Sequence, residues 1–126
     1  MTFKEKLSAA AEKNNSLLCV GLDTDPDRLP RGMGMVEFNR AIIDATKDIV
    51  CAYKPNLAFY EVGGIEGMRA LDETLSYIPG DIPVIGDAKR GDIGNTAMYY
   101  ARALFDTLGV DAATVSPYLG YDSVEP

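Results

Sequence analysis

Apolar residues recur at helical spacing in four stretches of the chain, and each stretch predicts a helix with one buried face. Thr2 precedes the first stretch and is a residue type that commonly caps a helix. Pro79-Gly80 and Gly109 stand just beyond the last two stretches, where helices usually end. The four predicted helices are Phe3–Ala11, residues 36–50, Ile65–Ile78 and Ala97–Leu108.

Short apolar runs lie between these helices and predict strands. The run Leu17–Leu22 is expected to be buried on both faces, and the proline at position 55 is expected to stop the second strand early. After the leading helix, strands and helices alternate with short connections, which predicts a parallel sheet. The four predicted strands are Leu17–Leu22, Cys51–Asn56, Pro83–Asp87 and Val110–Val115.

This alternation is compatible with an open doubly wound α/β sheet and with half of a (β/α)₈ barrel, and the pattern alone does not separate them. A complete barrel usually needs about 250 residues. The chain has 126 residues, so as a barrel it looks unfinished. Residues 1–126 are then expected to be the N-terminal half of a single barrel domain, with about the first four βα units.

Composition narrows the possible functions. The formal net charge of −7 argues against a broad surface for nucleic acid or acidic membranes. No apolar stretch reaches bilayer length, and residues 1–15 do not resemble a signal peptide, so a cytoplasmic protein is expected. Cys19 and Cys51 lie in or beside apolar runs and are expected to be buried, inert thiols. Without any histidine, catalysis would have to rest on lysine and aspartate.

Polar residues stand where the predicted strands end, which is the edge at which parallel α/β folds bind ligands. Any one of them could be a solvated loop residue, but three of the four strands end in a charge. Ser116 is better explained as a turn residue before a proline, and Asn95 or Thr96 is expected to cap the next helix. The candidate site residues at these ends are Asp23, Lys54 with Asn56, and Asp87 with Lys89.

One motif is more specific than this pattern. The run Asp87-Ala88-Lys89-Arg90-Gly91-Asp92-Ile93-Gly94-Asn95-Thr96 has the spacing D-x-K-x-x-D-I-x-x-T. It resembles the signature of the orotidine 5′-phosphate decarboxylases. Gly21-Leu22-Asp23 and the segment from Lys54 to Glu61 are similar to the first two strands of the longer bacterial branch of that family. The resemblance covers essentially all 126 residues, and Lys54-x-Asn56 upstream of the motif makes it strong.

The resemblance implies a (β/α)₈ barrel of the ribulose-phosphate-binding type and decarboxylation of orotidine 5′-phosphate to uridine 5′-phosphate without metal or cofactor. It implies an alternating array of Lys54, Asp87, Lys89 and Asp92. Lys89 would protonate C6 of the pyrimidine after carbon dioxide leaves, and Asp87 would lie beside the substrate carboxylate. Lys54 would hold Asp87 and a ribose hydroxyl.

The remaining implied roles concern the ribose and a second subunit. Asp23 would hydrogen-bond the ribose, with Asn56 close by. Asp92, Ile93 and Thr96 would enter the active site of a neighbouring subunit, which implies a homodimer. The family's phosphate-gripping loop and pyrimidine-amide contact belong to the second half of the barrel, so we expect little or no activity from residues 1–126 alone.

Three alternatives stay open. The metal-dependent 3-keto-gulonate-6-phosphate decarboxylases and hexulose-phosphate synthases share D-x-K-x-x-D, but they place an acidic metal ligand where this chain has Lys54. A non-catalytic half-barrel that serves as an interaction module is a second alternative. Metal binding by Asp23, Asp25 and Asp27 is a third, weakened because Pro26 interrupts the run and the spacing differs from that of a calcium loop.

Overall fold

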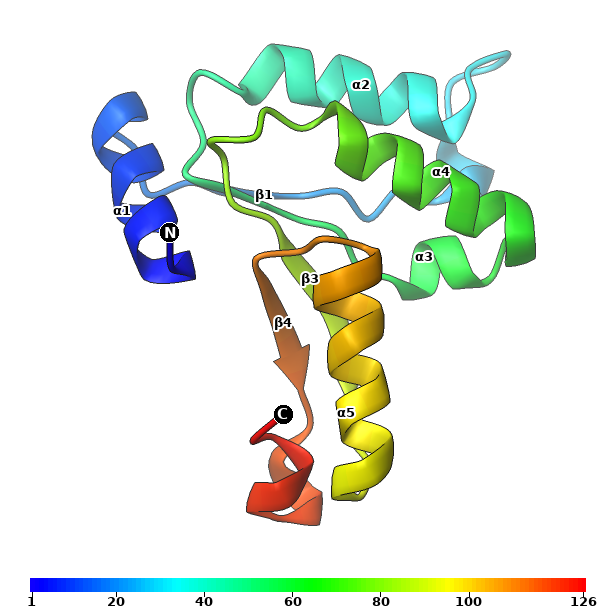
Figure 1. The fold of residues 1–126 in the computed structure, drawn as a ribbon. Coiled ribbons are helices and arrows are strands. Elements are labelled where there is room, and N and C mark those ends of the chain that lie inside the picture. Colours follow the sequence, from blue (N-terminus) through cyan, green and yellow to red (C-terminus); the bar gives the residue numbers. More distant parts are fainter.

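Four short parallel strands follow one another in sequence order in the computed structural model, which describes residues 1–126 (Figure 1). The strands are β1 (Cys19–Gly21), β2 (Ala52–Lys54), β3 (Ile85–Arg90) and β4 (Ala112–Val115). The helices are α1 (Phe3–Asn14), α2 (Met35–Thr46), α3 (Ala58–Glu61), α4 (Gly64–Tyr77) and α5 (Gly94–Arg102), which continues as a π-helical turn at Ala103–Thr107. Single 3₁₀ turns lie at Pro26–Arg28, Pro117–Leu119 and Tyr121–Ser123. The predicted alternation of strands and helices is confirmed.

The sheet consists of two parallel ladders, β1–β2 and β3–β4, which meet between β2 and β3. At that junction the ladder is reduced to two bridges, Tyr53–Val84 and Asn56–Asp87. The amide of Asp87 donates to the carbonyl of Pro55 at 2.9 Å, which holds the middle of β3 against the carboxyl end of β2. The strand order is therefore β1-β2-β3-β4, as expected for consecutive βα units.

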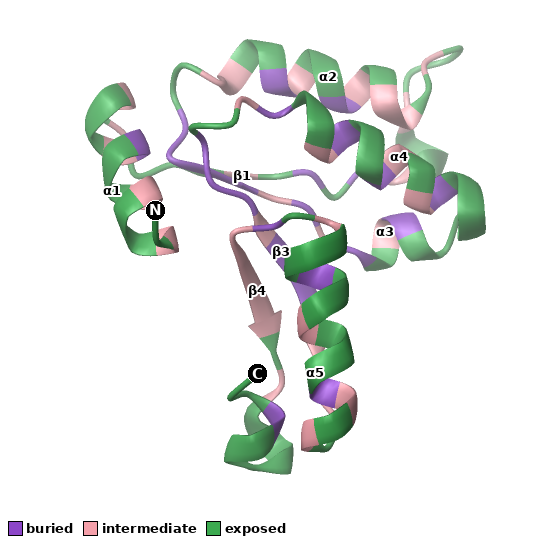
Figure 2. Cartoon of the chain, viewed as in Figure 1, coloured by how far each residue is buried: buried purple, intermediate pink, exposed green.

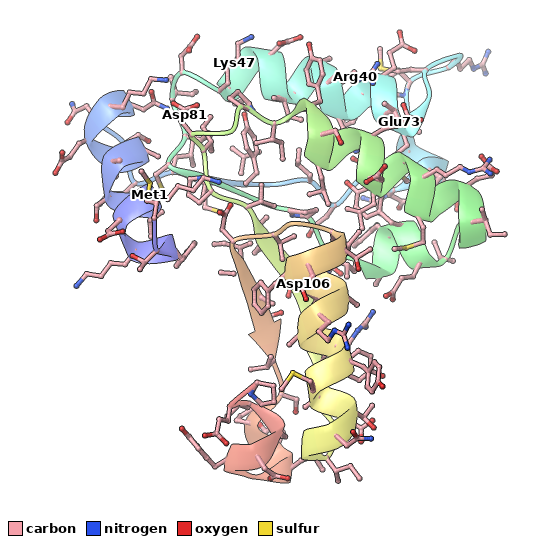
Figure 3. The ribbon with its side chains drawn as sticks, in the orientation of Figure 1. Met1, Arg40, Lys47, Glu73, Asp81 and Asp106 are labelled. Atoms are coloured by element: carbon pink, nitrogen blue, oxygen red, sulfur yellow. The ribbon has the colours of Figure 1, made fainter.

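The core lies where α2 and α4 pack side by side over β1, β2 and β3 (Figures 1 and 2). Ile43 of α2, Leu71 of α4 and Tyr53 of β2 have no exposed surface. Full burial of such side chains contributes about 1.5–3 kcal/mol each. On the solvent side, Arg40 of α2 forms an ion pair with Glu73 of α4, and their charged groups are 3.5 Å apart (Figure 3).

A buried polar cluster fixes the carboxyl end of β1 against the helices. Asn39 of α2 has no exposed surface, and its amide donates to Tyr60 Oη at 3.1 Å and to Thr74 Oγ1 at 2.9 Å. Its carbonyl oxygen accepts from the hydroxyl of Thr24. The hydroxyl of Tyr60 donates to the carbonyl of Leu22 at 2.8 Å, and burial raises its pKa to about 12. The segment that follows β1 is therefore held in one position.

Helix α1 lies across the amino ends of the strands. Thr2 and Glu5 form the capping box that begins it, which confirms the predicted cap. Lys6 Nζ is 2.8 Å from Asp111 Oδ2, just before β4, and the side-chain amide of Asn14 donates to the carbonyl of Val50, just before β2, at 2.7 Å. The helix therefore covers the amino ends and leaves the carboxyl ends, where the site is expected, uncovered.

The prediction that Leu17–Leu22 forms a strand buried on both faces is wrong for most of its length. Leu17 is 91% exposed, Leu18 is 48% exposed, and Cys19 is also exposed. β1 pairs on one side only, with β2, so its other edge has no neighbour in this structure. Cys51 is buried as expected, whereas the expectation of a buried Cys19 is corrected.

The helices differ from the predicted pattern in their bounds and in the burial of some apolar positions. Helix α3 was not predicted, because its four residues are too few to show a helical period. Helix α5 begins at Gly94 with Ile93 as its cap, so Asn95 and Thr96 lie in the first turn and do not cap it. Met98 and Ile65 are 48% and 74% exposed although the pattern placed both on apolar faces. None of the helices combines the length and apolar character of a segment that crosses a membrane.

Candidate active site

Asp87 of β3, which is bridged to Asn56 just beyond the end of β2, is the one charged residue among the buried residues of the chain, with 8% of its surface exposed. Its main chain is fixed on both sides, since its amide donates to Pro55 and its carbonyl accepts from Leu57. Burying a carboxylate costs several kcal/mol unless it is paired and hydrogen-bonded. The groups around this carboxylate therefore decide whether the arrangement is stable.

Three side chains from three strands donate to the Asp87 carboxylate. Lys89 Nζ lies 2.7 Å from both carboxylate oxygens, and Lys54 Nζ lies 3.2 Å from Oδ2. The hydroxyl of Thr114, on β4, donates to Oδ1 at 2.8 Å. Each oxygen thus has two donors. The structure brings Lys54, Asp87 and Lys89 together at the carboxyl edge of the sheet, as the sequence led us to expect.

These contacts lower the pKa of Asp87 to about 2. The hydrogen bond from Lys89 is the largest cause, and burial, which favours the neutral acid, opposes it. The hydrogen bonds from Thr114 and Lys54 lower the pKa further. Asp87 is therefore a fixed negative charge at neutral pH. The side chain of Lys89 is 66% exposed, so its ammonium extends from that charge toward the open end of the strands.

The main chain at Lys89 has an uncommon conformation, with φ of 49° in the left-handed region. The β3–β4 ladder is irregular at this point. Gly86 pairs with Ala113 and Arg90 with Val115, so β3 advances four residues where β4 advances two. Such a bulge redirects side chains. At this bulge, the Lys89 ammonium lies directly on the Asp87 carboxylate.

Asp23 and Asn56 extend the polar edge toward β1. Asp23 Oδ1 accepts from the backbone amide of Asn56 at 3.1 Å. The Asn56 side chain in turn accepts from the amide of Ala58 at 3.1 Å, at the start of α3. Asn56 is also the bridge partner of Asp87, so the ends of β1, β2 and β3 form one continuous polar edge.

Comparison with known proteins agrees with this geometry. The model of the "Orotidine 5'-phosphate decarboxylase / HUMPS family" matches residues 16–126. The chain belongs to this family. An orotidine 5′-phosphate decarboxylase of Herpetosiphon aurantiacus is 60% identical over 98% of this chain and 48% of its own length. A second one, from Dehalococcoides mccartyi, is 60% identical over 100% of this chain and 47% of its own length.

Solved structures of the orotidine 5′-phosphate decarboxylase family have the same fold. The orotidine monophosphate decarboxylase of Leishmania donovani superposes with a TM-score of 0.86 and 43% identity, over 100% of this chain and 48% of its own. A Toxoplasma gondii structure has a TM-score of 0.94 and 42% identity, over 99% of this chain and 44% of its own. The chain spans about half the length of these relatives and folds as part of the family's (β/α)₈ barrel.

Three residues of the family motif lie apart from the carboxylate cluster. Asp92 Oδ1 accepts from the amide of Ile93 at 2.8 Å, and Asp92 makes no hydrogen bond to Lys54, Asp87 or Lys89. The side chain of Ile93 is 66% exposed, and Thr96 lies half-buried in the first turn of α5. All three thus lie around the amino end of α5, on the far side of the bulge, rather than beside Asp87 in the same chain.

Two features of the site were not found from the sequence. Thr114 lies in an apolar strand, where a single threonine is an ordinary strand residue. Only the register of β4 against β3 shows that its hydroxyl faces Asp87. Arg90 pairs with Glu61 of α3, and its guanidinium lies 5.5 Å from the centre of the Tyr100 ring of α5. These contacts tie α3 to α5 around the end of β3. The spacing of arginine and glutamate along the sequence gives no signal of this pairing.

The metal site considered for Asp23, Asp25 and Asp27 does not form. No group of three or more acidic, cysteine or histidine side chains converges in the structure. Asp25 instead accepts from the amide of Asp27 at 3.0 Å and caps a 3₁₀ turn. Ser116 precedes the 3₁₀ turn at Pro117–Leu119, in agreement with its interpretation as a turn residue.

Proposed function

We propose that this chain contributes the catalytic lysines and aspartates of an orotidine 5′-phosphate decarboxylase, which converts orotidine 5′-phosphate to uridine 5′-phosphate in pyrimidine biosynthesis. One observation carries the proposal. A buried carboxylate, Asp87, holds two ammonium groups, Lys89 at 2.7 Å and Lys54 at 3.2 Å, at the open end of the strands. The 60% identity to relatives of that name supports the same substrate.

The chemistry needs a fixed positive charge. Carbon dioxide leaves when the bond between C6 and the carboxylate carbon breaks, and the electron pair stays on C6, where no adjacent carbonyl can absorb it. The Lys89 ammonium would stabilise that pair electrostatically and then transfer one proton to C6, leaving a neutral amine that regains its proton from solvent. A preorganised charge of this kind acts mainly in the transition state, so it raises the rate without any cofactor.

The neighbouring residues would place the substrate. Asp87 would lie beside the leaving carboxylate, and Lys54, whose side chain is one-third exposed, would also reach a ribose hydroxyl. Asp23, at the end of β1, would accept a hydrogen bond from the ribose, with Asn56 beside it.

A homodimer would complete the site. Asp92, Ile93 and Thr96 lie at the amino end of α5, away from Asp87, and in the proposed assembly they would enter the active site of the partner subunit. The alternating array would then consist of Lys54, Asp87 and Lys89 from one subunit and Asp92 from the other. A cytoplasmic location stays a prediction.

The metal-dependent sugar-phosphate enzymes on the same barrel are the nearest alternative, because the family description includes them. An ammonium at the end of β2 disfavours them. Lys54 Nζ donates to Asp87 there, and a positive charge 3.2 Å from that carboxylate would repel a divalent cation from it. Turnover of orotidine 5′-phosphate in the presence of a chelator separates the two activities.

The test is a hybrid protein in which residues 1–126 replace the matching part of the Herpetosiphon aurantiacus relative. We expect it to decarboxylate orotidine 5′-phosphate equally with and without EDTA. Lys89→Ala should lower kcat by at least about a hundredfold, since it removes both the proton donor and the stabilising charge. Lys47→Ala, at the residue that follows α2, is the matched control and should leave kcat unchanged, because the Lys47 side chain is 41% exposed and pairs only with Asp44. An inactive hybrid, metal dependence, or an active Lys89→Ala variant would contradict the proposal.

A further inference from the structure

Thr114 of β4 makes two hydrogen bonds, and each joins it to a different part of the site. Its Oγ1 accepts from the backbone amide of Lys89 at 3.0 Å and donates to Asp87 Oδ1 at 2.8 Å. Because a hydroxyl has only one proton, accepting from an amide and donating to a carboxylate fixes its orientation completely. A single oxygen atom thus connects the main chain of Lys89 to the charge on Asp87.

The location of Thr114 explains why one side chain can do this. Between the pairs Gly86–Ala113 and Arg90–Val115, the residues Asp87 to Lys89 of β3 face Thr114 alone. In a regular parallel ladder the amide of Lys89 would have a backbone carbonyl as its partner. The bulge removes that partner, and the hydroxyl of Thr114 takes its place.

The main chain that this hydrogen bond holds is strained. A lysine at φ of 49° lies in a region that costs a residue with a Cβ about 1 kcal/mol or more relative to ordinary strand conformations. Such conformations persist where several contacts fix them together. The contacts at Lys89 are its amide bond to Thr114 and its ammonium on Asp87, and both contacts converge on the same hydroxyl and carboxylate.

We propose that Thr114 is a positioning residue of the active site, whose hydroxyl couples the left-handed main chain at Lys89 to the Asp87 carboxylate and so sets the direction of the Lys89 ammonium. This inference rests on the proposed decarboxylase function. Thr114 does not itself touch the reacting atoms. Without its hydroxyl, the Lys89 amide loses its partner, the carboxylate loses one of four hydrogen bonds, and the ammonium is free to leave the position from which it donates a proton.

The test compares four variants of the hybrid protein: Thr114→Val, Thr114→Ala, Thr114→Ser and Thr107→Val. Valine has the shape of threonine without the hydroxyl. Alanine and serine differ from each other by one oxygen and are both smaller than threonine, so neither can overpack the site if the valine variant folds poorly. Thr107 is exposed, and its change to valine is the matched control. The measurements are kcat and KM for orotidine 5′-phosphate between about pH 3 and pH 9, and the midpoint of urea unfolding.

We expect Thr114→Val and Thr114→Ala to lower kcat by about tenfold to a hundredfold, as for the loss of a hydrogen bond to a charged group, and to leave KM within about twofold. Thr114→Ser should recover most of the rate. The loss of the Thr114 donor raises the pKa of Asp87, so the acid side of the kcat profile should move to higher pH in the valine and alanine variants but not in serine. A purely structural role would lower the unfolding midpoint without moving that profile.

Two results would overturn the inference. One is an alanine or valine variant with parental kcat and an unmoved acid limb, and the other is a serine variant no faster than alanine. These two results can be distinguished from results that contradict the proposed decarboxylase function. If the unsubstituted hybrid is active and Lys89→Ala is not, a neutral Thr114→Ala contradicts only the role of Thr114. If the hybrid is inactive, or Lys89→Ala is active, both proposals fall.

Discussion

Replacing Asp87 with asparagine should remove one defined part of the pH dependence of stability. Asparagine keeps the shape of the side chain and loses its charge. The carboxylate is nearly buried and accepts four hydrogen bonds, two of them from Lys89. Its pKa falls from 3.8 to about 2. A lowered pKa in the folded state means that ionised Asp87 stabilises the fold above the pKa of the unfolded chain, and that this stability is lost as the pH falls toward 2.

The size of the effect follows from the shift. Each pKa unit corresponds to 1.36 kcal/mol, so the full shift would give about 2 kcal/mol. The side chain of Lys89, the main cause of the shift, is 66% exposed, and solvent screening reduces its contribution. We therefore expect about 1–2 kcal/mol in total, of which about half should be lost by pH 3.

Urea unfolding of the parent hybrid and of Asp87→Asn, followed by circular dichroism from pH 7 to pH 3, measures this directly. The difference in unfolding free energy between the two proteins should shrink as the pH falls, because the other carboxylates titrate in both and cancel. Asp106→Asn, at an exposed residue without a hydrogen-bonded or ionic partner, is the control and should show no such trend (Figure 3). A difference that stays constant with pH would refute the reasoning.

Three further predictions follow from packing and from the extent of the chain. Asn39→Ala should destabilise the fold by about 3 kcal/mol in urea unfolding, since it removes three buried hydrogen bonds and leaves the Thr24 hydroxyl without its acceptor, whereas Asn95→Ala, at an exposed position, should be neutral. Gly67→Ala should cost about 3 kcal/mol or more, because the new Cβ would lie 1.8 Å from a backbone oxygen of α3, while Gly80→Ala meets nothing within 4 Å and should change stability little. Purified residues 1–126 alone should show little or no decarboxylation, and turnover at the rate of the hybrid would contradict this.

The positions of the charged groups were predictable because the apolar runs define where strands end. Lys54 and Asp87 follow buried stretches of β2 and β3, and parallel strands bring such positions to one edge. The burial of β1 was not predictable, because an apolar run shows that a strand can be buried but not whether a second neighbour covers it. Cys19 is the result: its apolar surroundings in the sequence suggest burial, and the open edge of β1 leaves it exposed.

The details that shape the site depend on contacts between distant residues, which a local pattern does not contain. The bulge that moves Arg90 into register with Val115 places two additional residues in β3, and nothing in the run from Asp87 to Arg90 distinguishes them from regular strand residues. The left-handed conformation falls on a lysine rather than on the nearby glycines, where φ above zero would be expected. Thr114 has a role only because that bulge leaves the Lys89 amide opposite it.

The charged cluster also lies where the sheet has the fewest backbone bridges, so its members should contribute differently to the stability of the fold. β2 and β3 share only two backbone bridges, and Lys54 of β2 and Thr114 of β4 both donate to the Asp87 carboxylate of β3. One carboxylate thus joins three strands, whereas the Lys89 ammonium is largely exposed and joins none. Asp87→Asn should therefore lower both kcat and the unfolding free energy. Lys89→Ala should lower kcat with a smaller loss of stability, because Lys54 and Thr114 still hold the carboxylate between the strands. Equal losses of stability in the two variants would contradict this difference. No loss in either variant would show that the carboxyl edge is held by the backbone, and that the cluster serves only the chemistry.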